Sequence, residues 1–196
     1  MYLNYYKRIL DILLVVLTFP VFVLLCLFVS ILIKLDDDGS IFYQADRIGK
    51  DSKIFTMYKF RTMKMGAPHL LNPDGSTYNA EDDERVTKIG KFLRKTSLDE
   101  LPQLINVLMG EMSFVGPRPS LAGALGTYQD DEIDKMKVRP GITGYTQAYF
   151  RNTISNREKR LNDAWYANNV SFWLDLKIII RTIQTVVSRE GLYTNQ

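Results

Sequence analysis

The chain has 196 residues, of which 46% are apolar and 24% are charged, and its formal net charge is +3. These values are typical of one folded domain, and they exclude a chain that is mainly disordered or of low complexity. With one cysteine, Cys26, and one histidine, His69, the chain can form neither an internal disulfide nor a Cys/His zinc site. Carboxylates would therefore have to bind any metal ion.

The first predicted element is a membrane anchor. Residues 12–33 carry no charge over 22 positions, and as one helix they would extend for about 33 Å, which is enough to cross a bilayer. The run is longer than the apolar region of a signal peptide, and no cleavage site of small residues follows it. We therefore expect residues 1–35 to form a membrane anchor and residues 36–196 to form a soluble domain.

Two features indicate how the anchor enters the membrane. Pro20 lies near the middle of the apolar run, where it removes a helical hydrogen bond and favours a kink. Basic residues on both flanks favour the cytoplasmic side: Lys7 and Arg8 before the run, and Lys34, Arg47, Lys50 and Lys53 after it. A helix that is broken at Pro20, and that enters and leaves on one face, satisfies both flanks. A kinked but ordinary transmembrane helix is the alternative.

After Gly39 the apolar residues alternate with polar ones. Residues 41–44 and 54–63 are predicted to be strands joined by a turn at residues 49–52, which makes a β-hairpin. In the second strand Lys59 and Arg61 share one face, where two cations could bind an anion or could simply protect an exposed edge. Residues 66–79 are rich in Pro, Gly, Asn and Ser and are predicted to form a loop.

Two amphipathic helices are expected further along the chain. In residues 86–95, apolar side chains recur at helical spacing opposite a basic face, which is typical of a helix at a lipid surface. A longer helix is predicted from about residue 171 to residue 189, with Ser171 as its N-cap. Its apolar stripe either packs in the core or lies at the membrane interface. With the hairpin, these elements predict an α+β protein that is mainly helical.

The residues best suited to chemistry lie at the start of a third predicted helix. This helix begins either at Ser97, with Glu100 completing a capping box, or at Asp99, with Pro102 in the first turn. The sequence does not decide between these starts. Either one places Asp99 and Glu100 at the positive end of the helix dipole, which favours ionised carboxylates and suits a phosphate. Asp99 could be a nucleophile and Glu100 a Mg²⁺ ligand, or the two could simply cap the helix.

Two turns after this helix carry arginines next to Gly and Pro. Arg118 stands between Pro117 and Pro119, and Arg139 opens the segment 139–144. A guanidinium on a stiff loop is well suited to a bidentate phosphate contact. The chain contains neither a Walker loop nor a dinucleotide-binding glycine motif. Phosphate recognition would therefore depend on scattered Arg and Lys residues together with a metal.

Four motifs follow one another along the chain: residues 59–63 (KFRTM), 97–104 (SLDELPQL), 115–119 (VGPRP) and 138–144 (VRPGITG). In this order and at this spacing they resemble the bacterial sugar transferase family, the monotopic phosphoglycosyl transferases. The resemblance covers nearly the whole chain. It is to the minimal members of the family, which hold only the anchor and the catalytic domain.

The resemblance implies a two-step enzyme reaction. Asp99 attacks the β-phosphate of a UDP-sugar and UMP leaves. A polyprenyl phosphate, typically undecaprenyl phosphate, then takes the phosphosugar from Asp99. Glu100 helps to bind Mg²⁺, or Mn²⁺ in its place. The candidate contacts to the diphosphate, the lipid phosphate or the nucleotide sugar are Lys59, Arg61, Arg94, Arg118, Arg139, Gln147, Arg151 and Asp163.

The resemblance also implies a place in the cell. The anchor would be a re-entrant helix hairpin broken at Pro20, in contact with membrane lipids. The catalytic domain, residues 36–196, would lie on the cytoplasmic face of the bacterial inner membrane. The reaction would be the first membrane step of exopolysaccharide, capsule, O-antigen or other glycoconjugate synthesis. The sequence identifies neither the sugar nor the pathway, and it leaves a homodimer open.

One stretch of the chain departs from the family pattern. Tyr149 and Phe150 stand where the family usually has Asn-Gly, and we expect these two aromatic rings to reshape the sugar pocket.

Two other classes of protein are alternatives to the transferase. A membrane-tethered scaffold, whose Asp99 and Glu100 only cap a helix, would release no UMP. A nucleic-acid binder conflicts with the low net charge and the acidic runs, so we expect no nucleic-acid partner.

Overall fold

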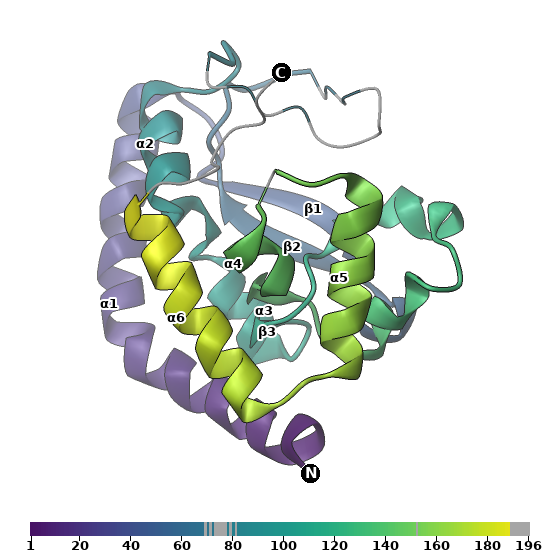
Figure 1. Cartoon of the computed structure of the whole chain (residues 1–196). Coiled ribbons are helices and arrows are strands. Elements are labelled where there is room, and N and C mark those ends of the chain that lie inside the picture. Colours follow the sequence, from purple (N-terminus) through teal and green to yellow (C-terminus); the bar gives the residue numbers. More distant parts are fainter. Residues whose placement is uncertain are drawn as a thin grey trace.

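The computed structural model describes residues 1–68, 70, 72, 78, 80, 82–151 and 153–188, so the predicted loop at residues 66–79 lies mostly outside the described residues. Within these residues the protein is α+β and mainly helical, as predicted (Figure 1). The helices are α1 (Lys7–Asp36), α2 (Lys88–Thr96), α3 (Gln103–Met109), α4 (Tyr145–Tyr149), α5 (Asn156–Asn168) and α6 (Phe172–Ser188). The strands are β1 (Phe42–Ile48), β2 (Ile54–Phe60), β3 (Ser113–Val115), β4 (Ser120–Leu121) and β5 (Gly141–Thr143).

The predicted β-hairpin is confirmed, but its strands have different ends. β1 and β2 pair antiparallel along all of their residues, so the first strand continues well past the predicted residues 41–44 because its partner keeps pairing up to the turn. β2 ends at Phe60 rather than at residue 63, so Arg61 lies outside the strand. β4 adds to the other edge of β1, and β3 pairs with β5 in parallel.

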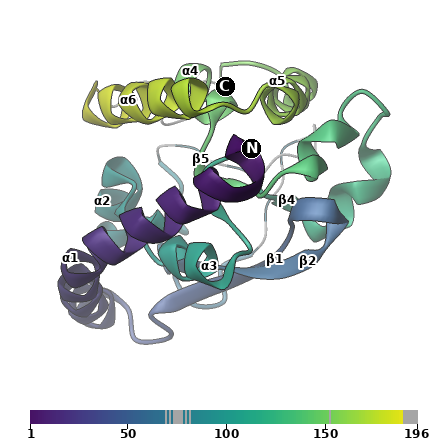
Figure 2. The same ribbon diagram turned by 90° about the horizontal axis from the view of Figure 1, so that it is seen from below.

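α1 is a single helix of 30 residues that continues through Pro20. It changes direction along its course and runs along the outside of the molecule (Figures 1 and 2). The sequence predicts a break at Pro20, whereas the helix bends and stays continuous. Val15, Phe22, Val29 and Ile33 follow one another on the buried face.

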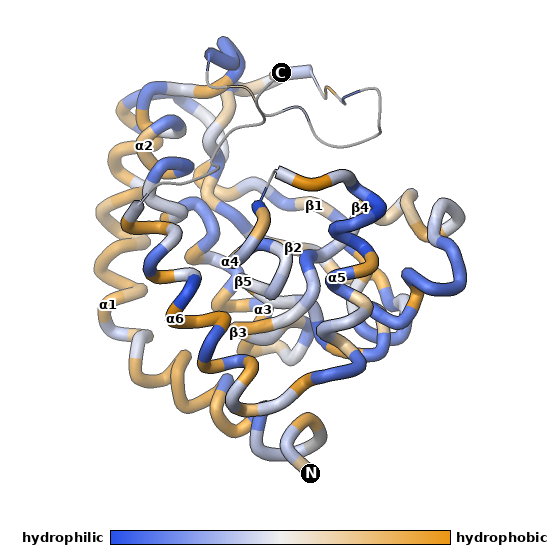
Figure 3. The backbone as a smooth tube through the Cα atoms, viewed as in Figure 1, coloured by the Kyte–Doolittle hydropathy of each residue, from blue (hydrophilic) through white to orange (hydrophobic). Residues whose placement is uncertain are grey.

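The remaining surface of α1 is exposed and apolar. The helix is hydrophobic along nearly its whole length (Figure 3), yet only 17% of its most apolar 18-residue window is buried. A core helix of this composition would be largely buried, and large exposed apolar surfaces mark contact with a partner or a membrane. α1 is long and apolar enough to span a bilayer, and its exposure indicates membrane association.

The N-terminal end of α1 is bound to the rest of the domain. Lys7 forms a buried ion pair with Asp175 of α6. The guanidinium of Arg8 donates hydrogen bonds to the carbonyl oxygens of Val107 and Leu108, at 2.5 and 2.9 Å, at the end of α3. Removing one partner of a buried ion pair leaves an uncompensated charge, which costs about 3–5 kcal/mol. The ion pair and the two hydrogen bonds attach this end of the helix to α6 and α3.

The C-terminal end of α1 is bound to the same domain. Arg61 forms an ion pair with Asp37, just past the helix, and donates from Nε to the carbonyl oxygen of Ser40 at 2.5 Å. The backbone N–H of Ile89 in α2 donates to the carboxylate of Asp36 at 2.8 Å. Both ends of the apolar helix therefore contact one and the same folded unit.

The two amphipathic helices form where the sequence predicts them. α2 follows Thr87, whose side chain accepts a hydrogen bond from the N–H of Gly90 at 2.9 Å. α6 follows Ser171, whose hydroxyl oxygen accepts from the N–H of Leu174 at 3.3 Å, as predicted for an N-cap. Most of the apolar stripe of α6 is exposed, which favours the interfacial alternative over the core: Phe172, Trp173, Ile180, Ile183 and Val187.

Candidate active site

Asp99 and Glu100 lie in a short 3₁₀ turn, Leu98–Glu100, between α2 and α3. Ser97 ends α2 in the left-handed conformation, with φ of 57°, so it closes one helix instead of opening the next. α3 begins only at Gln103, with Pro102 at the N-cap position, where the missing N–H of proline costs little. Both predicted starts of this helix are therefore wrong, and the acidic pair, Asp99 and Glu100, precedes α3.

Cations from several elements surround the acidic pair. The ammonium group of Lys59, on β2, donates to Oε1 of Glu100 at 2.6 Å, and the two side chains are 16% and 21% exposed. The charges of Arg94 and Arg118 act on Asp99 together with that of Lys59. The charges of Arg118 and Arg151 act on Glu100. The fold thus gathers four of the predicted cations around the pair: Lys59, Arg94, Arg118 and Arg151.

The two carboxyl groups differ in acidity. Burial raises the pKa of Asp99 to about 6, with a contribution from the charge of Glu100 and an opposing effect from Lys59 and Arg94. Burial also favours the protonated form of Glu100, but the charges of Lys59 and Arg118 outweigh it and hold the pKa of Glu100 below its usual value. Burial and neighbouring charges therefore set these acidities, whereas the sequence predicts that a helix dipole sets them.

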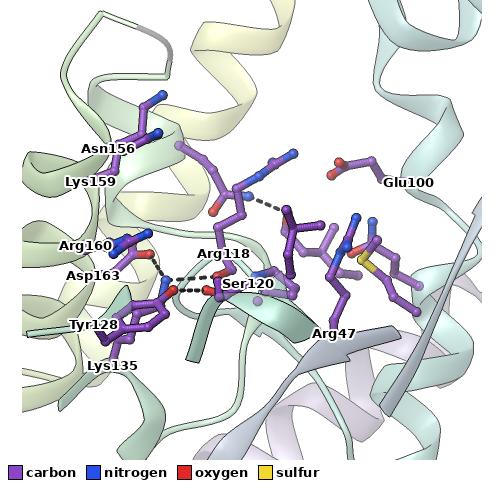
Figure 4. A pocket seen from close by; sticks show the side chains of 18 of the residues that line it. Arg47, Glu100, Arg118, Ser120, Tyr128, Lys135, Asn156, Lys159, Arg160 and Asp163 are labelled. Atoms are coloured by element: carbon purple, nitrogen blue, oxygen red, sulfur yellow. Dashed lines mark hydrogen bonds and ion pairs between the residues drawn. The ribbon is translucent and has the colours of Figure 1, made fainter. Parts of the chain in front are cut away.

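A cavity of about 210 Å³ is lined by Glu100, the second member of the acidic pair, whereas Asp99 is not in its lining. Glu100 stands on one side of it, Asn156, Lys159 and Arg160 of α5 stand on the other, and Arg118 lies between them (Figure 4). Among the described residues, six basic and two acidic side chains line the cavity: Arg47, Lys59, Arg118, Lys135, Lys159 and Arg160, with Glu100 and Asp163. The excess of positive charge favours an anionic ligand.

The predicted site residues divide into two groups. Five of them line the cavity: Lys59, Glu100, Arg118, Gln147 and Asp163. The other five are not in its lining: Asp99, Arg61, Arg94, Arg139 and Arg151. Arg61 is bound near the end of α1, because β2 ends before it and its side chain does not continue the face of Lys59. Arg139 donates to the carbonyl oxygen of Gly110 at 2.7 Å, beside Arg8 at the end of α3. The shared anion site predicted for Lys59 and Arg61 does not form.

Gln147 offers an unused acceptor at the cavity. Its Nε2 donates to the carbonyl oxygen of Ile142 at 3.3 Å. Its Oε1 is buried and has no hydrogen-bond partner among the residues that the structure describes. An unpaired buried acceptor costs about 1–3 kcal/mol, so a ligand that brings an N–H or O–H donor to this oxygen would be favoured.

The aromatic pair that departs from the family pattern packs in a group of aromatic rings. The ring of Tyr145 lies 5.0 Å from that of Tyr149, 5.9 Å from that of Phe150 and 4.8 Å from that of Trp165, measured between centroids. Within the described part of the chain, neither Tyr149 nor Phe150 lines the cavity. These rings pack against other aromatic rings, and their effect on the sugar pocket stays a prediction.

Several cavity residues are missing from the predicted site: Arg47, Tyr128, Lys135, Lys159 and Arg160. A local signal exists for those on α5. Ser155 and Glu158 form a capping box that begins this helix, and a helix from that point places Lys159 and Asp163 on one face. Arg47, Tyr128 and Lys135 have no such signal, because only the tertiary fold brings them to the cavity.

The acidic pair fits one kind of metal site. The described residues contain no group of three or more His, Cys, Asp or Glu side chains that could hold an ion. Mg²⁺ in proteins is commonly bound by one or two carboxylates, with substrate phosphates and water completing its coordination. Asp99 and Glu100 beside a positively charged cavity suit a Mg²⁺ ion that arrives with a phosphate ligand.

The comparisons with known proteins point to one family. The family model described as "Bacterial sugar transferase" matches residues 2–189. The "Uncharacterized sugar transferase EpsL" of Bacillus subtilis is 41% identical over 191 residues, which is 95% of this chain and 89% of that protein. The "Undecaprenyl-phosphate galactose phosphotransferase" of Salmonella typhimurium is 39% identical over 168 residues, 80% of this chain and 35% of that protein.

The length that the chain shares with its relatives varies. It spans 42% of an "Uncharacterized sugar transferase" of Haemophilus influenzae, to which it is 39% identical over 198 residues and 95% of its own length. It spans 88% of the "Exopolysaccharide production protein ExoY" of Rhizobium meliloti, at 39% identity over 198 residues and again 95% of its own length. The chain belongs to the bacterial sugar transferase family.

Proposed function

We propose that the protein transfers a sugar phosphate from a UDP-sugar to a polyprenyl phosphate such as undecaprenyl phosphate and releases UMP. The observation that carries this proposal is the acidic pair, set among cations and beside a positively charged cavity. The names of two relatives support the substrate classes: the Salmonella protein named above and the "UDP-galactose-lipid carrier transferase" of Erwinia amylovora, 38% identical over 190 residues.

In the first step an oxygen of ionised Asp99 attacks the β-phosphorus of the UDP-sugar. The new O–P bond forms while the bond from that phosphorus to the bridging oxygen breaks, and UMP leaves with the bonding electron pair. Lys59, Arg94 and Arg118 offset the negative charge that gathers around the phosphorus. The first step leaves a phosphosugar on the carboxylate of Asp99.

In the second step a phosphate oxygen of the polyprenyl phosphate attacks the same phosphorus. The bond to Asp99 breaks, the carboxylate is regenerated, and the lipid carries a diphosphate-linked sugar. Because a covalent intermediate separates the two transfers, the two substrates can use the site in turn. A pKa of about 6 leaves Asp99 mostly ionised at neutral pH and more basic than an ordinary aspartate.

Glu100, together with substrate phosphate oxygens, would hold Mg²⁺ or Mn²⁺, and the bound ion would reduce the repulsion between the diphosphate and the attacking carboxylate. Lys59 keeps Glu100 ionised and oriented through the 2.6 Å hydrogen bond. Arg94 is oriented by a hydrogen bond from its Nε to Oγ1 of Thr62, at 2.9 Å. We assign Arg151 and Gln147 to the binding of the nucleotide sugar.

A UMP-release assay tests this function. The protein is incubated in lipid micelles with undecaprenyl phosphate, Mg²⁺ and each of a panel of UDP-sugars. We expect the protein to release UMP with one UDP-sugar of the panel, or with a few of them. A protein that releases no UMP with any of them would instead be a membrane-tethered scaffold, and salt-dependent DNA binding would point to the nucleic-acid alternative.

We also propose that residues 1–35 form a re-entrant anchor and that residues 36–196 form the catalytic domain on the cytoplasmic face of the bacterial inner membrane. The support comes from the two ends of α1, which are both bound to the same domain through Lys7 and Asp37. A straight span would carry these ends to opposite sides of the bilayer. The bend along α1 and its exposed apolar surface fit a helix that enters and leaves on one face.

Cysteine labelling from outside intact spheroplasts tests the re-entrant topology. In a Cys26→Ser background, one reporter replaces exposed Tyr5 and a second replaces exposed Lys50. We expect a membrane-impermeant maleimide to label neither reporter until the cells are permeabilised. Labelling of either reporter in intact spheroplasts would contradict the model, and a periplasmic cysteine in another membrane protein serves as the positive control.

A further inference from the structure

Arg118 lies on a short connection between β3, which pairs with β5, and β4, which pairs with β1. The N–H of Gly116 donates to the carbonyl oxygen of Thr143 at 2.9 Å, and the N–H of Gly141 donates to that of Pro117, also at 2.9 Å. Pro119, on the other side of Arg118, has no N–H to donate. Arg118 and Pro119 lie between these pairings, and the carbonyl oxygen of Arg118 is a further point of attachment.

That carbonyl oxygen is bound by a buried lysine. The ammonium group of Lys135 donates to the carbonyl oxygen of Arg118 at 3.1 Å and to Oδ2 of Asp163 at 2.8 Å (Figure 4). The side chains of Lys135 and Asp163 are only 6% and 4% exposed. The other carboxylate oxygen of Asp163 accepts a hydrogen bond from Oγ1 of Thr146 at 2.6 Å. Residues from α4 and α5 thus fix the ammonium group that holds the loop.

Tyr128 adds a second connection between this lysine and the loop. Its ring centroid lies 5.8 Å from the ammonium group of Lys135, and its hydroxyl group is hydrogen-bonded to that of Ser120, two residues after Arg118. The loop is therefore held on both sides of the arginine. A buried ion pair by itself contributes little net stability, because the cost of desolvation offsets the attraction. The contact from Lys135 to the carbonyl oxygen of Arg118 therefore indicates that the Lys135–Asp163 pair serves to hold the loop.

We propose that Lys135 is a positioning residue for Arg118, and that Asp163 acts through Lys135 instead of touching the nucleotide sugar. The proposal rests on the proposed function, in which Arg118 acts on Asp99, Glu100 and the diphosphate. Asp163 has both oxygens engaged, one by Lys135 and one by Thr146. Without the ammonium group, the carbonyl oxygen of Arg118 loses its buried donor and the loop shifts. A misplacement of about 1 Å can lower activity about 10²-fold.

The first test reads the loop itself, without turnover. Lys135→Met removes the ammonium group and keeps a side chain of similar length. The control, Lys137→Met, removes a surface lysine two positions further along the chain, which pairs with Asp134. In the ligand-free protein we expect hydrogen exchange of the peptide spanning residues 115–121 to become faster in Lys135→Met and to stay unchanged in Lys137→Met. Equal exchange in the two variants would overturn the proposal, whether or not the protein releases UMP.

The second test asks whether the effect passes through Arg118. We expect Lys135→Met to lower kcat/KM for the UDP-sugar about 10²-fold, and Lys135→Arg, which keeps donors at this position, to recover most of it. In an Arg118→Ala background, Lys135→Met should lower kcat/KM by less than about 3-fold, because coupled residues are not additive. An equal loss in both backgrounds would mean a general structural role and would overturn the proposal. A wild-type protein without activity would instead overturn the proposed function.

Discussion

Replacement of Asp99 by asparagine is expected to abolish turnover, by about 10⁴-fold or more, because an amide cannot replace the carboxylate as a nucleophile. The same replacement is expected to stabilise the fold at pH 7. Asp99 has a pKa of about 6 in the folded protein, compared with an ordinary value of 3.8. The folded state therefore holds this proton more tightly than the unfolded chain does, and an ionised Asp99 opposes folding.

The size and the pH range of this stabilisation follow from the two pKa values of Asp99, about 6 in the folded protein and 3.8 ordinarily. The stability that comes from protonated Asp99 is fully present below about pH 3.8 and is lost as the pH rises through about 6. Neutral asparagine avoids this loss and should raise the free energy of unfolding at pH 7 by on the order of 1–3 kcal/mol. Thermal melts of the two proteins at pH 7 and at pH 4 check this, with a gain at pH 7 that shrinks at pH 4.

Trapping of the intermediate checks the role of Asp99 directly. Wild-type protein is mixed with a labelled UDP-sugar without lipid acceptor and digested, and the label is located by mass spectrometry. We expect a phosphosugar on the peptide that contains Asp99, and none in Asp99→Asn. The rate of UMP release should also rise as the pH increases through about 6, as Asp99 ionises. UMP release that requires the lipid acceptor, with no label retained on the protein, would show direct transfer between the two substrates.

Removal of the divalent cation is expected to have the second largest effect. Treatment with EDTA should lower UMP release by about 10²–10³-fold, and added Mg²⁺ or Mn²⁺ should restore it. Glu100→Gln should cause a loss of similar size, because an amide is a weaker ligand and leaves the ammonium group of Lys59 without its anionic partner. Activity is measured over a range of Mg²⁺ concentrations, and the variant should need more of the ion.

Glu111→Gln is the matched control for this prediction. Glu111 accepts a hydrogen bond from Nδ2 of Asn106 at 2.8 Å, outside the cavity lining, and glutamine keeps an acceptor oxygen there. We expect the control to retain the wild-type requirement for Mg²⁺. Full activity after exhaustive treatment with EDTA would contradict a role for a metal. A Glu100→Gln variant with a normal requirement for Mg²⁺ would show that another residue holds the ion.

The patterns that the sequence predicts well are local ones. The uncharged run predicts the long helix α1, the alternation after Gly39 predicts the hairpin, and Ser171 predicts the start of α6. Each depends on a short-range property: helix length, side-chain alternation, or a side chain that caps its own helix. The order of the four motifs identifies the family because such an order is specific, and the comparisons bear this out.

The errors arise where distant parts of the chain compete with a local pattern. Alternation places Arg61 beside Lys59, but β2 ends at Phe60 and Asp37 binds the guanidinium. The residues around Asp99 resemble a helix start, but Ser97 closes α2 and Pro102 delays α3. A local pattern predicts what a segment can form, and long-range contacts decide where it ends.

By itself, the sequence determined the family, the α+β class and the long apolar helix, because these follow from composition, short-range periodicity and motif order. Only the tertiary structure decided that both ends of α1 bind one domain, that burial raises the pKa of Asp99, and that Lys135 reaches the carbonyl oxygen of Arg118. These features depend on contacts between residues far apart in the chain. The pKa of Asp99 depends on its burial, and the contacts of α1 and Lys135 depend on the distances between residues. Burial and these distances arise only when the chain packs into its tertiary structure.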